Sequence, residues 1–170
     1  MSITIRTATA ADARDFSYVV CESWKAAYKD IVIPEEMEKN TDIEKRTSVF
    51  EKRITSVSDK EQFLIAYDED KPCGICWTRQ SCDEEMQGYG EVVAIYTLPE
   101  CWGKSVGKRL MDTAMDGLKS QGFTKVSLWA FEGNSRARCF YTKYGFNFDG
   151  TYKHSEFTDT SEVRYRMELV

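Results

Sequence analysis

What this sequence lacks already excludes several classes of protein. Only 3 of its 170 residues are proline and 10 are glycine, so the composition is neither that of a disordered linker nor that of a fibrous repeat. His154 is the single histidine, which leaves no histidine pair for a zinc site. No apolar run approaches the roughly 18 residues of a membrane-spanning helix. Lys and Arg number 23 against 28 Asp and Glu, and the net charge of −5 disfavours a general nucleic-acid-binding protein.

The remaining composition is that of one globular domain. With 42% hydrophobic and 30% charged residues, the chain is expected to form a single domain over residues 1–170. Met1–Arg6 has no basic stretch followed by an apolar run, so no secretory signal is expected and the predicted location is the cytoplasm. The 6 cysteines are therefore expected to be free thiols. Cys73 and Cys76 are three apart on a predicted strand, so we expect their thiols on opposite faces and no metal site.

Hydrophobic periodicity predicts the elements of the first half of the chain. Residues 3–8 alternate as a strand, and Thr9 and Asp12 offer caps to a helix that ends near Tyr28. Pro34 is expected to open a short acidic turn, and Asp42 to begin another helix.

The second half alternates strands and helices. Strands are predicted at 63–67, 73–79, 91–98, 125–131, from about 146, and at 163–169, and helices at 106–120 and 134–143. Residues 81–90 are expected to form a polar loop. Hairpins mixed with crossovers predict an α+β fold around one mixed sheet.

The turn that follows the strand 91–98 has the properties of an anion site. Backbone N–H groups of residues 103–107 can converge at the start of a helix, with Lys104, Lys108 and Arg109 nearby. A diphosphate suits such a turn, although an ordinary strand–helix connection has the same spacing. A P-loop is excluded because Leu98 stands where that motif needs glycine, and a dinucleotide fingerprint lacks its third glycine.

Two segments resemble motifs of the GNAT superfamily of N-acetyltransferases. Residues 96–107 resemble its acetyl-CoA loop, [QR]-x-x-G-x-[GA], and 134–146 resemble its N-x-x-A-x-x-[FL]-Y-x-x-x-G-F segment at every fixed position. The openings at 5–13 and 23–28 look like those of many bacterial members. The fixed positions of the second motif are Asn134, Ala137, Phe140, Tyr141, Gly145 and Phe146.

This resemblance implies a GNAT fold and acetyl-CoA as co-substrate, without a metal. The expected sheet is mostly antiparallel, six- to seven-stranded and splayed between strands four and five, with about four helices. The expected cofactor-binding residues are Ile95, Tyr96 and Thr97 on the strand, Gly103, Lys104, Ser105, Val106, Gly107 and Lys108 in the turn, and Asn134 and Tyr141 beyond it.

The first motif departs from the family pattern at two positions. Trp102 stands where Gln or Arg is usual, and Ser105 replaces the middle glycine. Both retain the backbone N–H through which such a loop acts, so acetyl-CoA binding is expected to survive. Ser105 then needs a negative φ or a strained backbone.

Two residues are predicted to carry the chemistry. Tyr141 matches the tyrosine that protonates the leaving thiolate in relatives, and its alternative is an aromatic packed in a helix. Glu91 opens the central strand where relatives often carry a base, and its alternative is a solvated strand end. Trp24 and Tyr28 are predicted to line the substrate site or to pack against the sheet. Trp129 argues against an N-terminal protein acetyltransferase, because some of these carry a glutamate there.

The predicted function is transfer of an acetyl group from acetyl-CoA to a primary amine of a small molecule, in a ternary complex. The alternatives are a GNAT-fold sensor that binds acyl-CoA without turnover and an enzyme for protein lysines or N-terminal amines. No nucleic-acid or membrane partner is expected, and a homodimer is expected from the family. The sequence does not identify the amine. The acidic residues 83–85 either attract a cationic amine or form a solvated loop.

Overall fold

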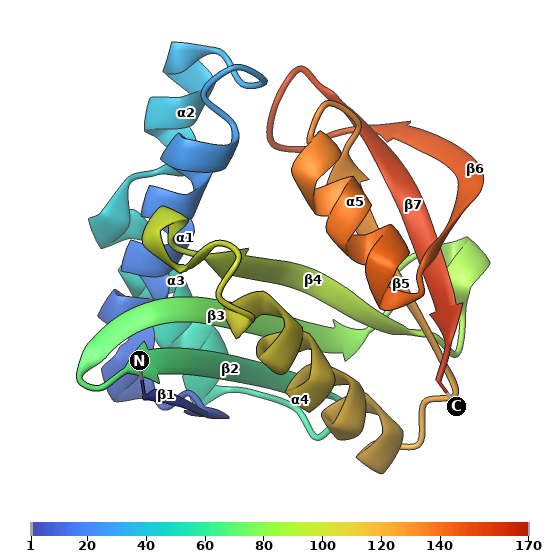
Figure 1. The fold of residues 1–170 in the computed structure, drawn as a ribbon, viewed down its shortest axis with the longest axis horizontal. Helices are drawn as coiled ribbons and strands as arrows, with labels where there is room; N and C mark the ends of the chain where they lie inside the picture. The colour runs from blue at the N-terminus through green and yellow to red at the C-terminus, as the bar shows by residue number, and fades with distance from the viewer. Residues whose placement is uncertain (1, 170) are drawn as a thin grey trace.

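The computed structural model describes residues 2–169, which form one mixed sheet flanked by helices (Figure 1). The strands are β1 (Ile3–Thr7), β2 (Glu61–Asp68), β3 (Lys71–Gln80), β4 (Gly90–Thr97), β5 (Lys125–Phe131), β6 (Asn147–His154) and β7 (Ser161–Glu168), in the spatial order β1-β2-β3-β4-β5-β7-β6. The helices are α1 (Ala13–Ala27), α2 (Pro34–Asn40), α3 (Ile43–Thr55), α4 (Val106–Ser120) and α5 (Ser135–Tyr144), with short 3-10 turns η1 (Ala10–Asp12), η2 (Glu84–Met86) and η3 (Pro99–Cys101). The predicted α+β class with one mixed sheet is confirmed.

One predicted element was wrong. The segment after Pro34 is the helix α2 rather than a turn, which brings the α-helices of the described residues to five rather than about four. Proline at the first helical position loses no hydrogen bond, and Glu35 and Glu36 suit the positive end of the helix dipole. The same residues that suggested a turn therefore start a helix.

The sheet separates between β4 and β5. These two strands are parallel, and they pair only through Gly90, Glu91 and Val92 before they diverge (Figure 1). The expected splay between the fourth and fifth strands is thereby confirmed. Beyond Val92, the edge of β4 that faces β5 has no strand beside it, so its backbone N–H and C=O groups are open to a ligand.

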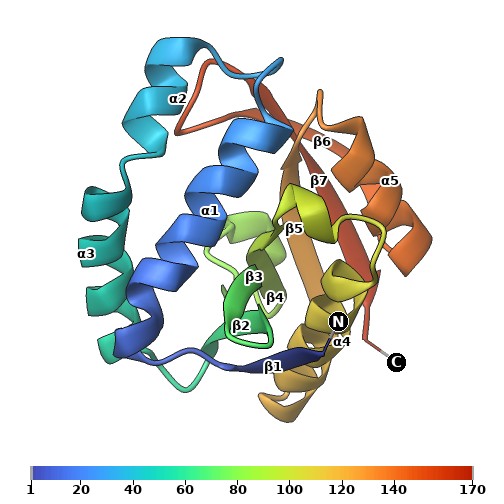
Figure 2. The ribbon, with the colours of Figure 1, turned by 60° about the vertical axis from the view of Figure 1, so that its left-hand side comes forward.

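Helices cover the two faces of the sheet with separate apolar cores (Figure 2). On one face, Phe16 of α1 and Phe50 of α3 contact Phe63 of β2. On the other, α4 buries the stripe Val106, Leu110, Met111, Ala114, Met115 and Leu118. This spacing of three and four residues puts one side of α4 against the sheet.

Two β-bulges change which face a side chain occupies. Ala94 pairs with Trp77 but Val92 pairs with Thr78, so Val93 is an extra residue in β4. Because a bulge reverses the alternation, Glu91 lies on the same side of the strand as Ala94 and Tyr96. Strand alternation without the bulge would have put Glu91 on the α4 side.

The second bulge corrects the prediction for the cysteine pair. Ala66 pairs with Gly74 and Tyr67 with Pro72, so Cys73 is the extra residue of β3. Cys73 and Cys76 consequently pack in the same core, not on opposite faces. Both are free thiols, as are the other four cysteines. Within residues 2–169, no helix is long and apolar enough to cross a membrane, and no group of acidic, His or Cys side chains could hold a metal.

Candidate active site

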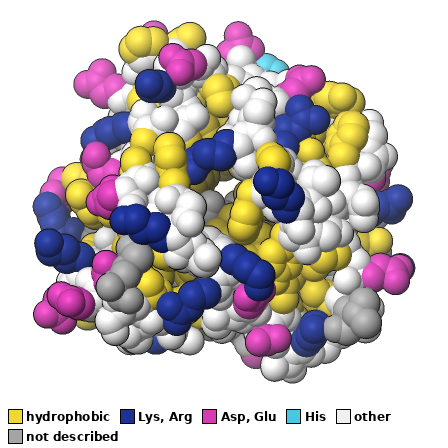
Figure 3. Space-filling view, viewed as in Figure 1, with side chains coloured by type: hydrophobic (Ala, Val, Ile, Leu, Met, Phe, Trp, Pro, Cys, Tyr) yellow, Lys and Arg dark blue, Asp and Glu magenta, His cyan; other side chains and the backbone are white. Residues whose placement is uncertain are grey.

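Two cavities meet where β4 leaves β5. The larger, of about 1050 Å³, lies on the side of α2 and α3, and the smaller, of about 460 Å³, lies between the η3–α4 turn and α5. In Figure 3, this second region is a hollow with Lys and Arg side chains around it. The residues that line both cavities are Tyr28, Ile95, Tyr96, Asn134, Ala137 and Tyr141.

The smaller cavity gathers most residues that the sequence assigned to acetyl-CoA. All of them line it except Lys104 and Val106. Helix α4 begins at Val106, so the N–H groups of Val106, Gly107 and Lys108 have no partner within the helix. The N–H of Lys104 is not free as predicted, because it donates to Cys101 O at 3.2 Å. The first turn of α4 therefore supplies the open donors.

The three cations predicted around this turn have different surroundings. Lys108 lines the cavity and pairs with Asp112 at 2.7 Å, whereas Lys104 is exposed outside the lining. Arg109 donates from Nη2 to the Ile3 carbonyl at 3.0 Å, and this contact directs it toward β1. Only Lys108 of the three thus lies at the cavity.

An arginine that the sequence did not point to also lines this cavity. The Arg136 guanidinium lies 3.3 Å from the centroid of the Trp102 ring, and Trp102 Nε1 donates to Thr97 O at 2.9 Å. Burial lowers the pKa of Arg136. Stacking on a fixed aromatic ring holds the planar guanidinium in place. A cation from α5 therefore lies beside the motif position where relatives carry Gln or Arg and this chain carries Trp102.

The turn before α4 contains two residues in the left-handed conformation. Gly103 has φ of 73° and Ser105 has φ of 63°, so Ser105 adopts the strained alternative to a negative φ. Its side chain forms no capping hydrogen bond that would offset this strain. The glycine of the family motif would adopt this backbone without steric strain.

Replacing Ser105 by glycine is expected to stabilise the fold by about 1 kcal/mol, because the left-handed strain disappears. Differential scanning calorimetry should show a Tm rise of about 2–4 °C. Gly103→Ala is the reverse control, because it adds a side chain at the other left-handed position. A Cβ at residue 103 meets no atom within 4 Å, so the substitution strains only the backbone and should lower Tm. A lower Tm for S105G would contradict the account.

Tyr141 lies at the junction of the cavities. Its ring packs against Tyr165, Phe146 and Phe140, and its hydroxyl forms no hydrogen bond with any residue of 2–169. Burial raises the pKa of Tyr141. The structure thus holds a neutral phenol between the two cavities, and no residue of 2–169 is hydrogen-bonded to its hydroxyl group.

Asn134 and the aromatic pair of α1 have structural roles as well as cavity positions. Asn134 Oδ1 accepts from Ala137 N at 3.2 Å, which confirms the predicted helix cap. Trp24 Nε1 donates to Tyr96 Oη at 3.0 Å, and Tyr28 Oη donates to the same oxygen at 3.4 Å. Trp24 and Tyr28 are buried in the core, as one alternative predicted, and they also line the larger cavity; their contact with a substrate stays a prediction.

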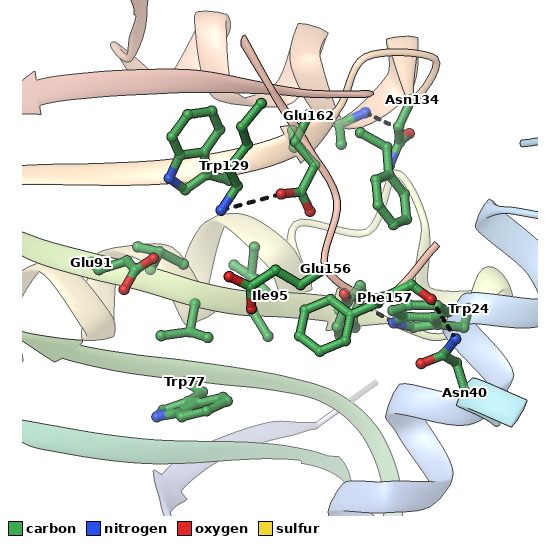
Figure 4. A pocket seen from close by; sticks show the side chains of 18 of the residues that line it. Trp24, Asn40, Trp77, Glu91, Ile95, Trp129, Asn134, Glu156, Phe157 and Glu162 are labelled. Atoms are coloured by element: carbon green, nitrogen blue, oxygen red, sulfur yellow. Dashed lines mark hydrogen bonds and ion pairs between the residues drawn. The ribbon is translucent and has the colours of Figure 1, made fainter. Parts of the chain in front are cut away.

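Figure 4 shows the larger cavity with Glu91 at one end, Trp24 and Asn40 at the other, and Ile95 between them. Glu91 is buried, and its Oε2 accepts from Arg79 Nε at 2.9 Å. Its other oxygen forms no hydrogen bond within residues 2–169, so Glu91 is an ion-paired wall residue, not a solvated strand end. At the far end, Asn40 Nδ2 donates to Phe157 O at 3.1 Å, which joins α2 to the β6–β7 loop.

Several acids around this cavity are ion-paired. Arg164, itself buried, pairs with Asp83 at 3.0 Å, Glu85 at 2.8 Å and Asp149 at 2.7 Å, so one cation is shared by three carboxylates. The acidic stretch 83–85 is therefore tied to the sheet but keeps part of its negative charge. Glu162 pairs with Lys153 at 3.3 Å, and Lys153 Nζ lies 4.3 Å from the Trp129 ring centroid.

Comparison with known proteins agrees with the fold and the motifs. The model described as the acetyltransferase (GNAT) family matches residues 20–146, and the chain belongs to this family. It is 27% identical over 153 residues to the spermidine N(1)-acetyltransferase of Thermoplasma acidophilum, covering 89% of this chain and 92% of that protein. The crystal structure of the PaiA N-acetyltransferase from the same organism, in complex with coenzyme A, matches with a TM-score of 0.76, 25% identity and 99% coverage of each chain.

The mycothiol acetyltransferases form a second group of relatives. That of Acidimicrobium ferrooxidans is 30% identical over 91 residues, which is 54% of this chain. The chain spans only 29% of the length of that protein.

Proposed function

We propose that this protein transfers an acetyl group from acetyl-CoA to a primary amine of a small molecule, by direct attack within a ternary complex. The observation that carries the proposal is the meeting of two cavities at Tyr141, which lines both of them. Two substrates can then reach one proton donor from opposite sides. The relatives named for mycothiol and spermidine support a small-molecule acceptor.

The smaller cavity fits acetyl-CoA, which would supply an activated acetyl group on a thioester. The open N–H groups of Val106, Gly107 and Lys108 and the stacked guanidinium of Arg136 suit a diphosphate. The unpaired edge of β4 around Ile95 can pair with the amide groups of an extended ligand arm.

In this proposal each residue of the junction has a defined task. Tyr141 holds a proton at Oη for the leaving thiolate, which is why a neutral phenol is needed there. Glu91 takes a proton from the attacking amine through water, using the oxygen that Arg79 leaves free. Trp24 and Tyr28 form the wall against which the acceptor lies.

The decisive comparison is with a sensor that binds acyl-CoA without turnover. An acetyltransferase and a sensor would both bind CoA, but only the acetyltransferase would release free thiol when acetyl-CoA is supplied together with an amine. A panel of small amines, monitored by thiol titration, tests this. Thiol release no faster than in amine-free controls, with CoA bound, would support the sensor. The contact between α2 and the β6–β7 loop at the cavity end favours a small acceptor over a protein chain.

Arg136→Gln is expected to raise the Kd of CoA by about 10- to 100-fold, because a charge-assisted contact to phosphate is lost. Isothermal titration calorimetry measures this, and the salt dependence of Kd should weaken in the variant. Arg14→Gln is the matched control, since Arg14 is an exposed arginine of α1 that pairs with Glu44 outside both cavities. An unchanged Kd for R136Q would remove Arg136 from the cofactor site.

A further inference from the structure

The wall of the larger cavity that α2 and α3 form carries charge that the proposed chemistry does not use. One side of α3 faces the cavity. It is formed by residues three or four apart in the sequence, namely Arg46, Val49, Phe50 and Arg53. Lys45 of α3 and Lys39 of α2 extend this wall. We call Lys39, Lys45, Arg46 and Arg53 the cationic wall. Within residues 2–169, none of the four forms an ion pair.

The described acids and cations that line this cavity are equal in number, seven of each, but of the acids only Asp42 belongs to the α2–α3 segment. Asp83 and Glu85 share the charge of Arg164 with Asp149, Glu91 is paired with Arg79, and Glu162 is paired with Lys153. Asp42 caps α3 by accepting from Lys45 N.

Among the described acids that line the cavity, Asp42, Glu84 and Glu156 form no ion pair, and all three are exposed. Asp42 caps α3 on the side of the cationic wall, whereas Glu84 and Glu156 come from η2 and from the β6–β7 loop. Figure 4 shows Glu156 near the middle of the cavity view, between Ile95 and Phe157. The charged side chains without an ion pair are therefore four cations and Asp42 on the helical side of the cavity, and two acids on the loops.

Arg46 is the best-placed cation of the wall. Its guanidinium carbon lies 5.3 Å from the Trp24 ring centroid, and its Nε donates to the Asn40 carbonyl. Nη1 and Nη2 have no hydrogen-bond partner within residues 2–169, so their N–H groups are available in a fixed fork. Arg53 lies similarly over Trp77, at 4.9 Å from the ring centroid. Each guanidinium group thus lies over an aromatic ring, and neither forms an ion pair within residues 2–169.

We propose that the acceptor carries an anionic group, a carboxylate or a phosphate, in addition to the amine that is acetylated, and that Arg46 binds this group. This inference rests on the proposed acetyl transfer. The anion would lie against the cationic wall while the amine reaches Ile95 and Tyr141 at the junction. A polyamine whose further amines lay against this wall would instead place positive charge beside four cations that have no ion pair, an arrangement disfavoured by like-charge repulsion.

Matched pairs of amines that differ in the anion test this. Phosphoethanolamine is compared with ethanolamine, phenylalanine with phenylalaninamide, and spermidine serves as the polycation. Turnover is measured as free thiol from acetyl-CoA, and binding is measured by calorimetry on CoA-loaded protein. The two pairs separate phosphate from carboxylate. The anionic member of at least one pair should be preferred by about tenfold or more in kcat/KM and in affinity.

Arg46→Gln should reduce that preference to about twofold or less, while Arg46→Lys should retain part of it through the charge alone. Lys52→Gln on the same helix is the control, because Lys52 is exposed and lies outside the cavity lining, and it should leave the preference unchanged. Melting temperatures confirm that the variants are folded.

The outcomes separate this inference from the proposed function. If the neutral amines or spermidine are turned over as fast as the anionic amines or faster, the inference of an anionic acceptor is wrong, while the proposed acetyl transfer is supported. Binding of an anionic amine that depends on Arg46, without thiol release, would support the inference and refute the proposed function. Failure of every anionic amine to bind the CoA-loaded protein would overturn the inference.

Discussion

Replacing Tyr141 by phenylalanine is expected to lower kcat by about 10²- to 10⁴-fold, because the proton donor for the leaving thiolate is lost. The Kd of CoA should stay within about twofold, since the ring that packs against Tyr165 and Phe146 is kept. The hydroxyl has no hydrogen-bond partner in the described residues, so its removal should not affect folding. Steady-state kinetics and CoA titration on the same preparation measure both effects.

The pH profile gives this prediction a second readout. Burial raises the pKa of Tyr141, so the folded enzyme keeps the phenolic proton up to at least about pH 10. A raised pKa means that the active protonated form is lost only as pH rises through that higher value. The wild-type rate should therefore not fall between neutral pH and about pH 10. Tyr165→Phe is the matched control because it removes a buried hydroxyl that accepts from Arg138 outside both cavities. A Tyr141→Phe rate equal to that of the control would eliminate Tyr141 as the acid.

Replacing Glu91 by glutamine is expected to lower kcat/KM by about 10²-fold, because the amide cannot accept the proton of the amine. Glutamine keeps the size of the side chain and can still accept a hydrogen bond from Arg79, so the wall of the cavity is retained. The acidic limb of the pH–rate profile should change in the variant if Glu91 acts as the base. Rates measured over the pH range, with Tm as the folding check, provide the test.

Glu61→Gln is the comparison for this experiment. Arg79, the partner of Glu91, lies over the Trp77 ring at 5.5 Å from its centroid, and Glu61 accepts from Trp77 Nε1 at 2.8 Å. Glu61 does not line the larger cavity. Its substitution should leave the rate within about twofold of the wild type. A Glu91→Gln enzyme with an unaltered pH profile would show that water or another group removes the proton.

The sequence predicts well those features that depend on local periodicity. The apolar stripe of α4 repeats over four turns, and the Asn134 cap needs only residues within the next turn, so both were visible. The GNAT fold with its splayed sheet was implied by the resemblance of the two motifs to those of that family. Helix α2 was missed because a short proline-led acidic segment has the composition of a turn and of a helix start alike.

The features that the sequence did not show depend on pairing between distant segments. A bulge such as Val93 exists only relative to the partner strand, so the face that Glu91 occupies follows from the β3–β4 register. The stack of Arg136 on Trp102 joins two elements that are separate in the sequence. Similarly, the periodicity of α3 indicates one buried face, but it does not indicate that Arg46 and Arg53 flank that face at a cavity.

The central claim is that acetyl transfer takes place where the two cavities meet at Tyr141. A crystal structure of the protein with CoA bound tests it most directly. The account predicts the pyrophosphate at the first turn of α4 beside Arg136, and the CoA sulfur within hydrogen-bonding distance of Tyr141 Oη with the larger cavity open on its other side. A sulfur that lies away from Tyr141, or CoA bound outside the smaller cavity, would contradict it.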